Sequence, residues 1–146
     1  MSAGAPPGQA FPGRPLTRFP VHLGLGATAV VQPEMSGPES TASQWYDAYA
    51  TRNSGDGAEG RLVALHSFDA SWTSWEMHPA GDELVVCIAG AMTLIQQLPE
   101  GREQRVRLGP GDYVVNPPGA WHTADVEGEA TALFVTAGLG TQHRPR

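Results

Sequence analysis

Two glutamates and a histidine, side chains able to bind a metal ion or transfer a proton, lie close together in the stretch WEMHPAGDE, residues 75–83. If the segment before the PAGD turn is a strand, alternate side chains share a face, so Glu76 and His78 point the same way. Glu83 would begin the next strand, and two adjacent antiparallel strands would direct all three groups at one volume. Burying such groups without partners is costly. A divalent cation accepts imidazole and carboxylate together, so the pattern favours a metal site.

A second group of residues, GDYVVNPPGAWH, lies about thirty residues downstream. Gly111 and Asp112 mark a turn, and the run Pro117–Gly119 predicts a sharp corner. The chain then re-enters the barrel with Trp121 and His122 on opposite faces. His122 is therefore a fourth candidate ligand, delivered from a different strand pair.

The elements around these residues read as short strands. From Arg61 onward, segments rich in Val, Leu, Ile, Thr and aromatic residues alternate with clusters of Gly, Pro, Asp and Asn. This pattern predicts an all-β sandwich or barrel. The LPEGR turn predicts a hairpin over residues 91–108. Upstream, we expect a short strand over residues 27–32 and one or two helical turns from Ser43.

Composition narrows the function classes. At 146 residues the chain is of single-domain length, and a net charge of −6 argues against nucleic acid or an anionic membrane as main partner. All nine basic residues are arginine, so lysine Schiff-base chemistry and a Walker-type phosphate loop are excluded. No apolar run is long enough for a membrane helix, and the N-terminus does not resemble a secretory signal. Cys87 is the only cysteine, so no internal disulfide can form, which fits a cytoplasmic location.

The spacing of the first group resembles the first motif of the cupin family, small β-barrels of the double-stranded β-helix type. That motif runs Gly, five residues, His-x-His, three or four residues, Glu, six residues, Gly. The residues that match it in position are Glu76, His78, Glu83 and Gly90. The sequence departs from the motif twice: Ala70 replaces the leading Gly, and Glu76 replaces the first His.

The second group resembles the second cupin motif: Gly, five residues, Pro-x-Gly, two residues, His, three residues, Asn. The matching residues are Gly111, Pro117, Gly119 and His122, while Val126 replaces the terminal Asn. The resemblance covers about residues 60–137 and implies an all-β cupin barrel, jelly-roll-like, with an N-terminal extension.

The resemblance places the family's metal ligands on His78, Glu83 and His122. A carboxylate can also ligate, so Glu76 completes a set of two histidines and two carboxylates. Carboxylates favour harder ions, so we expect one divalent ion, Fe or Mn before Zn or Ni.

Each of these residues also has an interpretation that requires no metal ion. Glu76 could be a ligand, a pocket acid or a solvated bystander at a strand end. The four groups together could be the hydrogen-bonded polar interior of a barrel that has lost its metal.

Five other side chains have alternatives of their own. His66 could line the site or sit at its rim, and Trp72 could wall it or serve only in packing. Cys87 is expected to be a small apolar filler rather than a ligand. Tyr46 and Tyr49, in the N-terminal extension, could close over the mouth or pack on a neighbouring chain.

These observations predict a domain organisation and a function. We expect a flexible tail over residues 1–15, an extension over 16–60, the barrel over 61–137 and a solvated C-terminal tail over 138–146. The resemblance implies a small-molecule protein. We expect a metal-dependent enzyme acting on a small oxygenated molecule, of dioxygenase, isomerase, decarboxylase or lyase type. The alternative is a non-catalytic cupin that binds or senses a small ligand.

A homodimer is expected from two features of the sequence. The extension, residues 16–60, is too long for a mere linker. Leu84, Val86 and Ile88 would face outward from the barrel and need a cover.

Overall fold

The computed structural model describes residues 13–35 and 42–146. Its helical elements are α1 (Ala42–Arg52) and three short 3-10 turns, η1 (Leu25–Ala27), η3 (Ser54–Glu59) and η4 (Pro99–Gly101). Its strands are β1 (Val21–Gly24), β2 (Thr28–Val31), β3 (Arg61–Phe68), β4 (Ser74–Met77), β5 (Glu83–Gln97), β6 (Glu103–Leu108), β7 (Tyr113–Asn116), β8 (His122–Thr136) and β9 (Gln142–Pro145). No described helix is long and apolar enough to cross a membrane.

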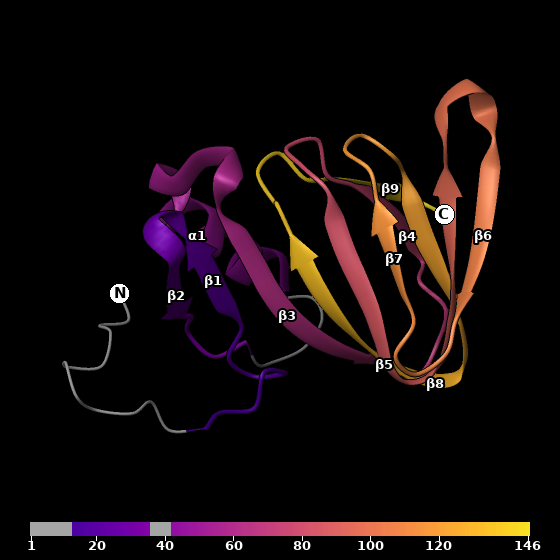
Figure 1. The fold of residues 1–146 in the computed structure, drawn as a ribbon, viewed down its shortest axis with the longest axis horizontal. Coiled ribbons are helices and arrows are strands. Elements are labelled where there is room, and N and C mark those ends of the chain that lie inside the picture. The colour runs from indigo at the N-terminus through magenta and orange to yellow at the C-terminus, as the bar shows by residue number, and fades with distance from the viewer. Residues whose placement is uncertain (1–12, 36–41) are drawn as a thin grey trace.

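The two long strands, β5 and β8, pair along nearly their whole length and organise the sheet. The other edge of β8 pairs first with β4 and then with β3. The other edge of β5 pairs first with β7 and then with β6. The paired strands β5 and β8 therefore belong to both halves of the sheet. One half has the strand order β2-β1-β3-β8-β5-β7, and the other has the order β9-β4-β8-β5-β6. Figure 1 shows how strongly the sheet curves between its ends. The expectation of an all-β barrel is confirmed.

The β5–β8 ladder bends where its register shifts, between Cys87 and Ala89 and again between Gly90 and Ala91. Such bulges bend a strand and increase its twist. Gly90 has a φ of +74°, and a Cβ there would lie 2.0 Å from the carbonyl oxygen of Glu129. Only glycine fits this close approach, so Gly90 allows the two halves of the sheet to fold over one core.

The core lies between the inner faces of the two halves. On β5 the side chains of Val85 and Cys87 are fully buried, whereas Ile88 is 49% exposed. Leu84 and Val86, expected to face outward, are less buried than Val85 and Cys87, but the alternation ends at the register shift, beyond which Ala89 is exposed. Cys87 packs among the apolar side chains of the core. The other members of the core cluster come from four strands: Met92, Leu94, Leu108, Val114, Ala124, Ala130, Ala132 and Phe134.

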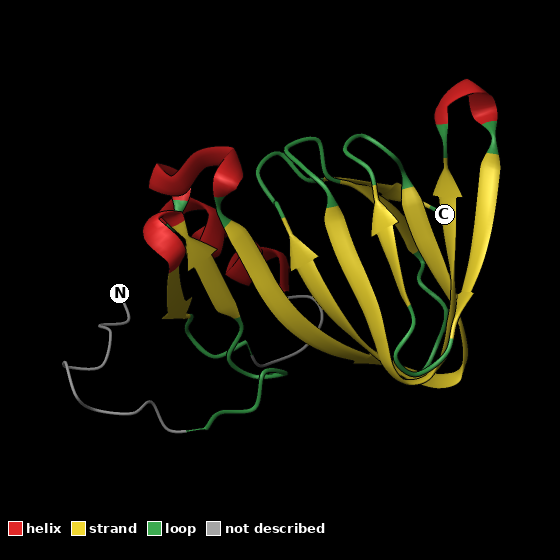
Figure 2. Ribbon diagram, viewed as in Figure 1, coloured by secondary structure: helices red, strands yellow, loops and turns green. Residues whose placement is uncertain are grey.

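The described part of the extension folds onto the barrel. β1 pairs with β3 and with β2, which confirms the short strand expected over residues 27–32. Tyr49 on α1 packs against Leu62 and Ala64 of β3. Figure 2 shows most of the helical elements gathered at this end, with the exception of η4 at the tip of the β5–β6 hairpin. The tail expected over residues 1–15 falls almost entirely outside the described residues, and the barrel boundary at residue 61 stays a prediction.

Two expectations about strand neighbours are wrong. We expected β4 and β5 to pair directly, but in the described part of the chain β4 pairs with β8 and β9, and β5 with β6, β7 and β8. The turn after β4 carries the chain across the barrel from one half of the sheet to the other. Residues 138–146, expected to be a solvated tail, contain β9, which pairs with all of β4. The exposed edge of β4 offers backbone groups that this last segment satisfies.

Candidate metal centre

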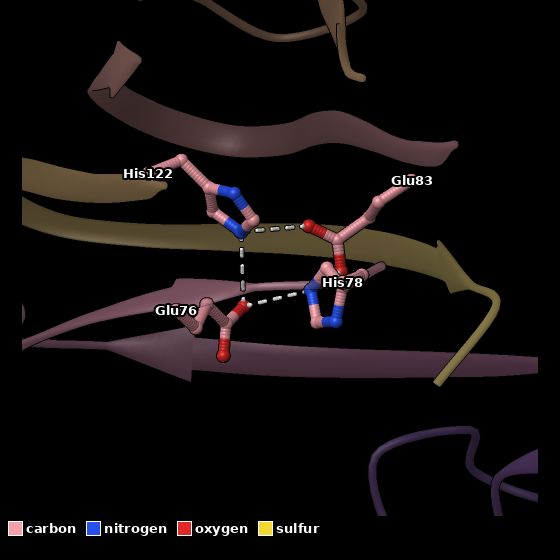
Figure 3. Close-up of side chains that lie close together, drawn as sticks. All are labelled: Glu76, His78, Glu83 and His122. Carbon is pink, nitrogen blue, oxygen red and sulfur yellow. Dashed lines mark hydrogen bonds and ion pairs between the residues drawn. The ribbon is translucent and has the colours of Figure 1, made fainter. Parts of the chain in front are cut away.

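Four side chains meet at the junction of the two halves of the sheet. Glu76 lies on β4, His78 directly follows β4, Glu83 begins β5 and His122 begins β8. Figure 3 shows the four side chains pointing toward one another, and one potential ligand atom from each lies within 4.8 Å of the others. The structure therefore brings together all four residues that the sequence singled out.

The imidazole nitrogens and carboxylate oxygens are close enough to share an ion. The Nε2 atom of His122 lies 3.1 Å from Oε1 of Glu83 and 3.3 Å from Oε1 of Glu76. The Nε2 atom of His78 lies 3.1 Å from Oε2 of Glu83 and 3.5 Å from Oε1 of Glu76. Nevertheless, this buried His78 nitrogen has no partner in hydrogen-bond geometry. The four side chains do not satisfy one another completely.

The second ring nitrogen of each histidine fixes its tautomer. Nδ1 of His122 lies 3.1 Å from the carbonyl oxygen of Ala120, which can only accept. Nδ1 of His78 lies 2.8 Å from Oγ1 of Thr141, whose hydroxyl donates to the carbonyl oxygen of Gly138 at 2.8 Å. Both Nδ1 atoms must therefore donate. In its neutral form each ring directs the lone pair of Nε2 into the cluster, as metal-binding histidines do.

Glu83 is held by residues that the sequence analysis did not single out. Asn116 donates to its Oε1 at 3.0 Å, and Thr136 donates to its Oε2 at 2.6 Å. Gln96 in turn donates to Oδ1 of Asn116 at 2.7 Å. The sequence signal for Asn116 and Thr136 was a polar side chain in an otherwise apolar strand. Their partner could be known only from strand pairing, because Glu83 lies opposite both Asn116 and Thr136 in the register.

The charges of the cluster balance. Burial lowers the pKa of His78, but the adjacent carboxylates of Glu76 and Glu83 outweigh burial and raise it to about 10. The same causes raise the pKa of His122 to about 9. Burial raises the pKa of Glu83, but the two histidines outweigh it and lower that pKa to about 2. The pKa of Glu76 likewise lies well below its usual value, because interactions with the histidines outweigh burial.

At neutral pH the metal-free cluster thus holds two carboxylates and two imidazolium groups. A divalent ion could replace the two protons without changing the net charge. The donor set therefore fits a divalent ion.

An aromatic wall lies beside the four residues. The ring of Trp72 lies 6.5 Å from that of His122, and both Trp72 and His66 pack against Phe134. The hydroxyl of Tyr46 lies 3.2 Å from Nε2 of His66. Burial, followed by the charges of Glu76 and Glu83, raises the pKa of Tyr46. Tyr46 on α1 and His66 on β3 therefore form a polar pair at this aromatic wall.

His143 is a neighbour of the site. From the sequence it was expected to lie in a solvated C-terminal tail. It lies opposite Glu76 in the pairing of β9 with β4, and its Nε2 is 3.3 Å from Oε2 of Glu76. Its side chain is 59% exposed. No local signal could have identified it, because its position depends on the pairing of a segment that follows β4 by more than sixty residues.

Comparison with known proteins assigns the class. Residues 68–138 match the sequence model of the cupin domain. Residues 68–138, just under half of the chain, therefore form a cupin domain, which agrees with the fold. Comparison with functionally curated proteins finds no match.

Solved structures share the fold at low identity. Oxalate oxidase in complex with the substrate analogue glycolate is 16% identical, with a TM-score of 0.53, over 64% of this chain and 50% of that chain. Oxalate decarboxylase from Bacillus subtilis, a protein with Mn(II) centres, is 15% identical with a TM-score of 0.51, over 66% of this chain and 26% of that chain. A cupin-2 domain protein from Shewanella frigidimarina is 19% identical with a TM-score of 0.42, over 59% of this chain and 71% of that chain. This chain thus spans half of the oxidase and about a quarter of the decarboxylase.

Proposed function

We propose that the protein binds one divalent metal ion through Glu76, His78, Glu83 and His122. The observation that carries this proposal is the buried Nε2 atom of His78, which has no hydrogen-bond partner although it lies between two carboxylates. An unsatisfied polar atom at a buried position needs an explanation, and an ion between the four donors supplies one. The tautomers of His78 and His122 support the same conclusion, because both rings present Nε2 to the cluster.

Two carboxylates and two imidazoles favour Fe or Mn, with Zn or Ni as the next candidates. The two carboxylates would balance the charge of a divalent ion. Once bound, such an ion would polarise an oxygen-bearing small molecule. Glu76 is the most exposed of the four, at 23% of its side chain against 6% or less for the others, so its side of the cluster is the side open to a ligand.

The function that this site supports best is a metal-dependent enzyme acting on a small oxygenated molecule, of dioxygenase, isomerase, decarboxylase or lyase type. The polar pair Tyr46–His66 supports this proposal, because it supplies a hydroxyl and an imidazole, and His66 packs on the same Phe134 ring as Trp72, the neighbour of His122. Non-catalytic binding or sensing of a small ligand uses the same residues and is the alternative. The two differ in turnover, not in ligand contacts.

The metal proposal is tested by calorimetric titration of the chelator-treated protein with Mn²⁺, Fe²⁺, Zn²⁺ and Ni²⁺. We expect one ion per chain, and no tight binding in Glu83→Gln, which keeps the shape of the side chain but removes its charge. Glu103→Gln, an exposed change on β6, is the matched control and should bind as the unchanged protein does. Absence of binding in the unchanged protein would overturn the proposal.

Turnover separates the two candidate functions. The metal-loaded protein would be incubated with oxalate, glycolate and a panel of hydroxylated aromatic compounds, while product formation and ligand binding are both measured. Product formation that is lost in Glu83→Gln supports the enzyme. Saturable binding of a panel compound without turnover supports the binding protein.

We also propose that the protein forms a homodimer through the outer face of β5 and β7. Ile88, Tyr113 and Val115 are 49%, 65% and 44% exposed, and Leu84 and Val86 lie opposite Val115 and Tyr113 in the register. A row of apolar side chains on one sheet face is typical of an interface. Light scattering that reports a monomer at micromolar concentration would contradict the proposal.

A further inference from the structure

The C-terminal segment, residues 141–146, is fastened to the barrel by its side chains as well as by strand pairing. The guanidinium of Arg144 lies 4.4 Å from the ring centre of Trp121 and 5.5 Å from that of Trp75. It also donates to Oε1 of Gln97 at 2.6 Å. Stacking of arginine on aromatic rings and a direct hydrogen bond both restrict motion. The segment is therefore a fixed part of the structure around the site.

Because Arg144 faces outward, its neighbour His143 faces the cluster. Its Nε2 lies 3.3 Å from Oε2 of Glu76, whereas Oε1 of Glu76 faces His78 and His122. The two oxygens of this carboxylate thus have separate partners. The ion-pair contact at Oε2 favours an orientation of the carboxylate in which Oε1 points into the cluster.

Thr141, directly before β9, acts in the same way on His78. Its hydroxyl has one hydrogen, which it donates to the carbonyl oxygen of Gly138. Its oxygen can therefore only accept from Nδ1 of His78, at 2.8 Å. This contact requires the Nδ1–H tautomer and leaves Nε2 available to an ion.

We propose that Thr141 and His143 are positioning residues of the metal centre, through which the C-terminal segment sets the tautomer of His78 and the orientation of Glu76. The inference rests on the proposed metal site. His143 supports a ligand and does not act as one, because it lies outside the group of four converging donors found among the described residues. Its exposed position and its contact with Glu76 agree with a supporting role.

The Thr141 contact is more buried than the His143 contact. Loss of the first should therefore lower metal affinity more than loss of the second. Residues that orient metal ligands typically change metal affinity about 10- to 100-fold when they are lost. The Thr141 contact involves a buried histidine, so Thr141→Val should fall within this range. The His143 contact is exposed and weakened by solvent, so His143→Leu should lower affinity only roughly two- to fivefold.

Matched variants of the full chain test the inference, with Mn²⁺ as the probe in calorimetric titrations. Thr141→Ser keeps the hydroxyl and should retain the affinity that Thr141→Val loses. His143→Gln keeps a donor and should retain more affinity than His143→Leu. Gln142→Ala, an exposed change on the same strand, is the control and should bind as the unchanged protein does. Circular dichroism and melting temperature establish that each variant is folded.

Two results would overturn the inference. One is equal Mn²⁺ affinity in Thr141→Val, Thr141→Ser and the unchanged protein. The other comes from nitrogen-15 spectra of the zinc-loaded, unchanged protein, where a His78 ring that binds zinc through Nδ1 would contradict the proposed tautomer. This spectrum gives an answer even if Thr141→Val fails to fold. If the unchanged protein binds neither ion, the metal site itself fails and the inference fails with it, whereas tight binding without variant effects overturns the inference alone.

Discussion

Two buried groupings of histidine and acid lie within the described residues, and of these only the one in the barrel brings four candidate ligands together. In the N-terminal extension, His22 is 3% exposed, its Nδ1 lies 2.7 Å from the hydroxyl of Tyr49, and its Nε2 lies 2.6 Å from Oδ2 of Asp56. Each ring nitrogen has its own partner. In the barrel, two Nε2 atoms share two carboxylates, and one of these nitrogens has no hydrogen bond.

The tautomers of the two groupings are opposite. Asp56 can only accept, so Nε2 of His22 carries a hydrogen and the carboxylate is satisfied. Burial, followed by the charge of Asp56, raises the pKa of Tyr49 to about 12, so its phenol stays protonated and can donate to Nδ1. His22 therefore presents no free lone pair. Residue types alone therefore do not define a metal site. A site requires donor atoms that point at one volume and are not already satisfied by hydrogen bonds.

The largest expected effect is the loss of bound metal when a histidine ring is removed from the barrel grouping but not when one is removed from the extension. His122→Ala removes one of two imidazoles from the barrel, so we expect its affinity to fall by more than the roughly 10- to 100-fold typical of a lost supporting residue. The strand signal in circular dichroism should persist. Metal per chain, measured by mass spectrometry after dialysis, checks this. Unchanged metal content would remove His122 from the site.

Proton release should mark the barrel grouping in solution. With pKa values of about 10 and 9, His78 and His122 hold protons at neutral pH that a metal ion must displace. We expect about two protons released per ion near pH 7.5, and affinity that rises with pH until about 9 to 10. Calorimetry in buffers of different ionisation enthalpy measures the protons. Release of none would show that the ion binds elsewhere.

The metal-free protein should show the opposite dependence of stability on pH. From pH 6.5, the usual histidine value, up to about 9 or 10, the folded protein retains protons that the unfolded chain has lost. The free energy of unfolding should therefore fall as pH rises through this range. At the acid end, the contribution of Glu83 is full above 4.5 and is lost as pH falls toward 2. Urea unfolding at several pH values checks both ends, and stability that rose from pH 7 to 10 without metal would contradict the ion-paired cluster.

A change in the extension should affect stability but not metal. His22→Leu leaves the carboxylate of Asp56 and the hydroxyl of Tyr49 without their partner, which should lower the free energy of unfolding by about 1–3 kcal/mol. Urea unfolding measures the loss. Metal content should match that of the unchanged protein, and a parallel loss of metal would end the distinction between the two groupings.

The smallest expected effect is a change of metal preference. Glu76→His would change two carboxylates and two imidazoles into one carboxylate and three imidazoles. Imidazole gains more with Ni²⁺ and Zn²⁺ than with Mn²⁺, so the variant's preference should move toward the later metals. Competition of Mn²⁺ against Zn²⁺ in one buffer gives the ratio. If the ratio stays constant while metal still binds, Glu76 is a pocket acid or a bystander and not a ligand.

The sequence by itself was sufficient for the barrel and for the four converging side chains. The strand pattern predicted that Leu84, Val86 and Ile88 would face outward, because a strand places successive side chains on opposite faces whatever its neighbours are. The resemblance of two stretches to the cupin motifs implied that Glu76, His78, Glu83 and His122 would meet. These signals are local, or repeat at fixed distances along the chain, so they can be read without knowing which strands pair.

Only the tertiary structure decided how the site is supported and charged. The residues that orient the ligands are Asn116, Thr136, Thr141 and His143, and each is placed by contacts between strands or loops far apart in the sequence. Our expectation that β4 and β5 pair directly failed for the same reason, since a turn joins two segments without specifying whether they become neighbours. The C-terminal residues carried no apolar pattern, yet β9 forms because the edge of β4 has backbone groups to satisfy. The raised pKa values of His78 and His122 likewise depend on burial beside two carboxylates, which arises only when the two halves of the sheet close over the core.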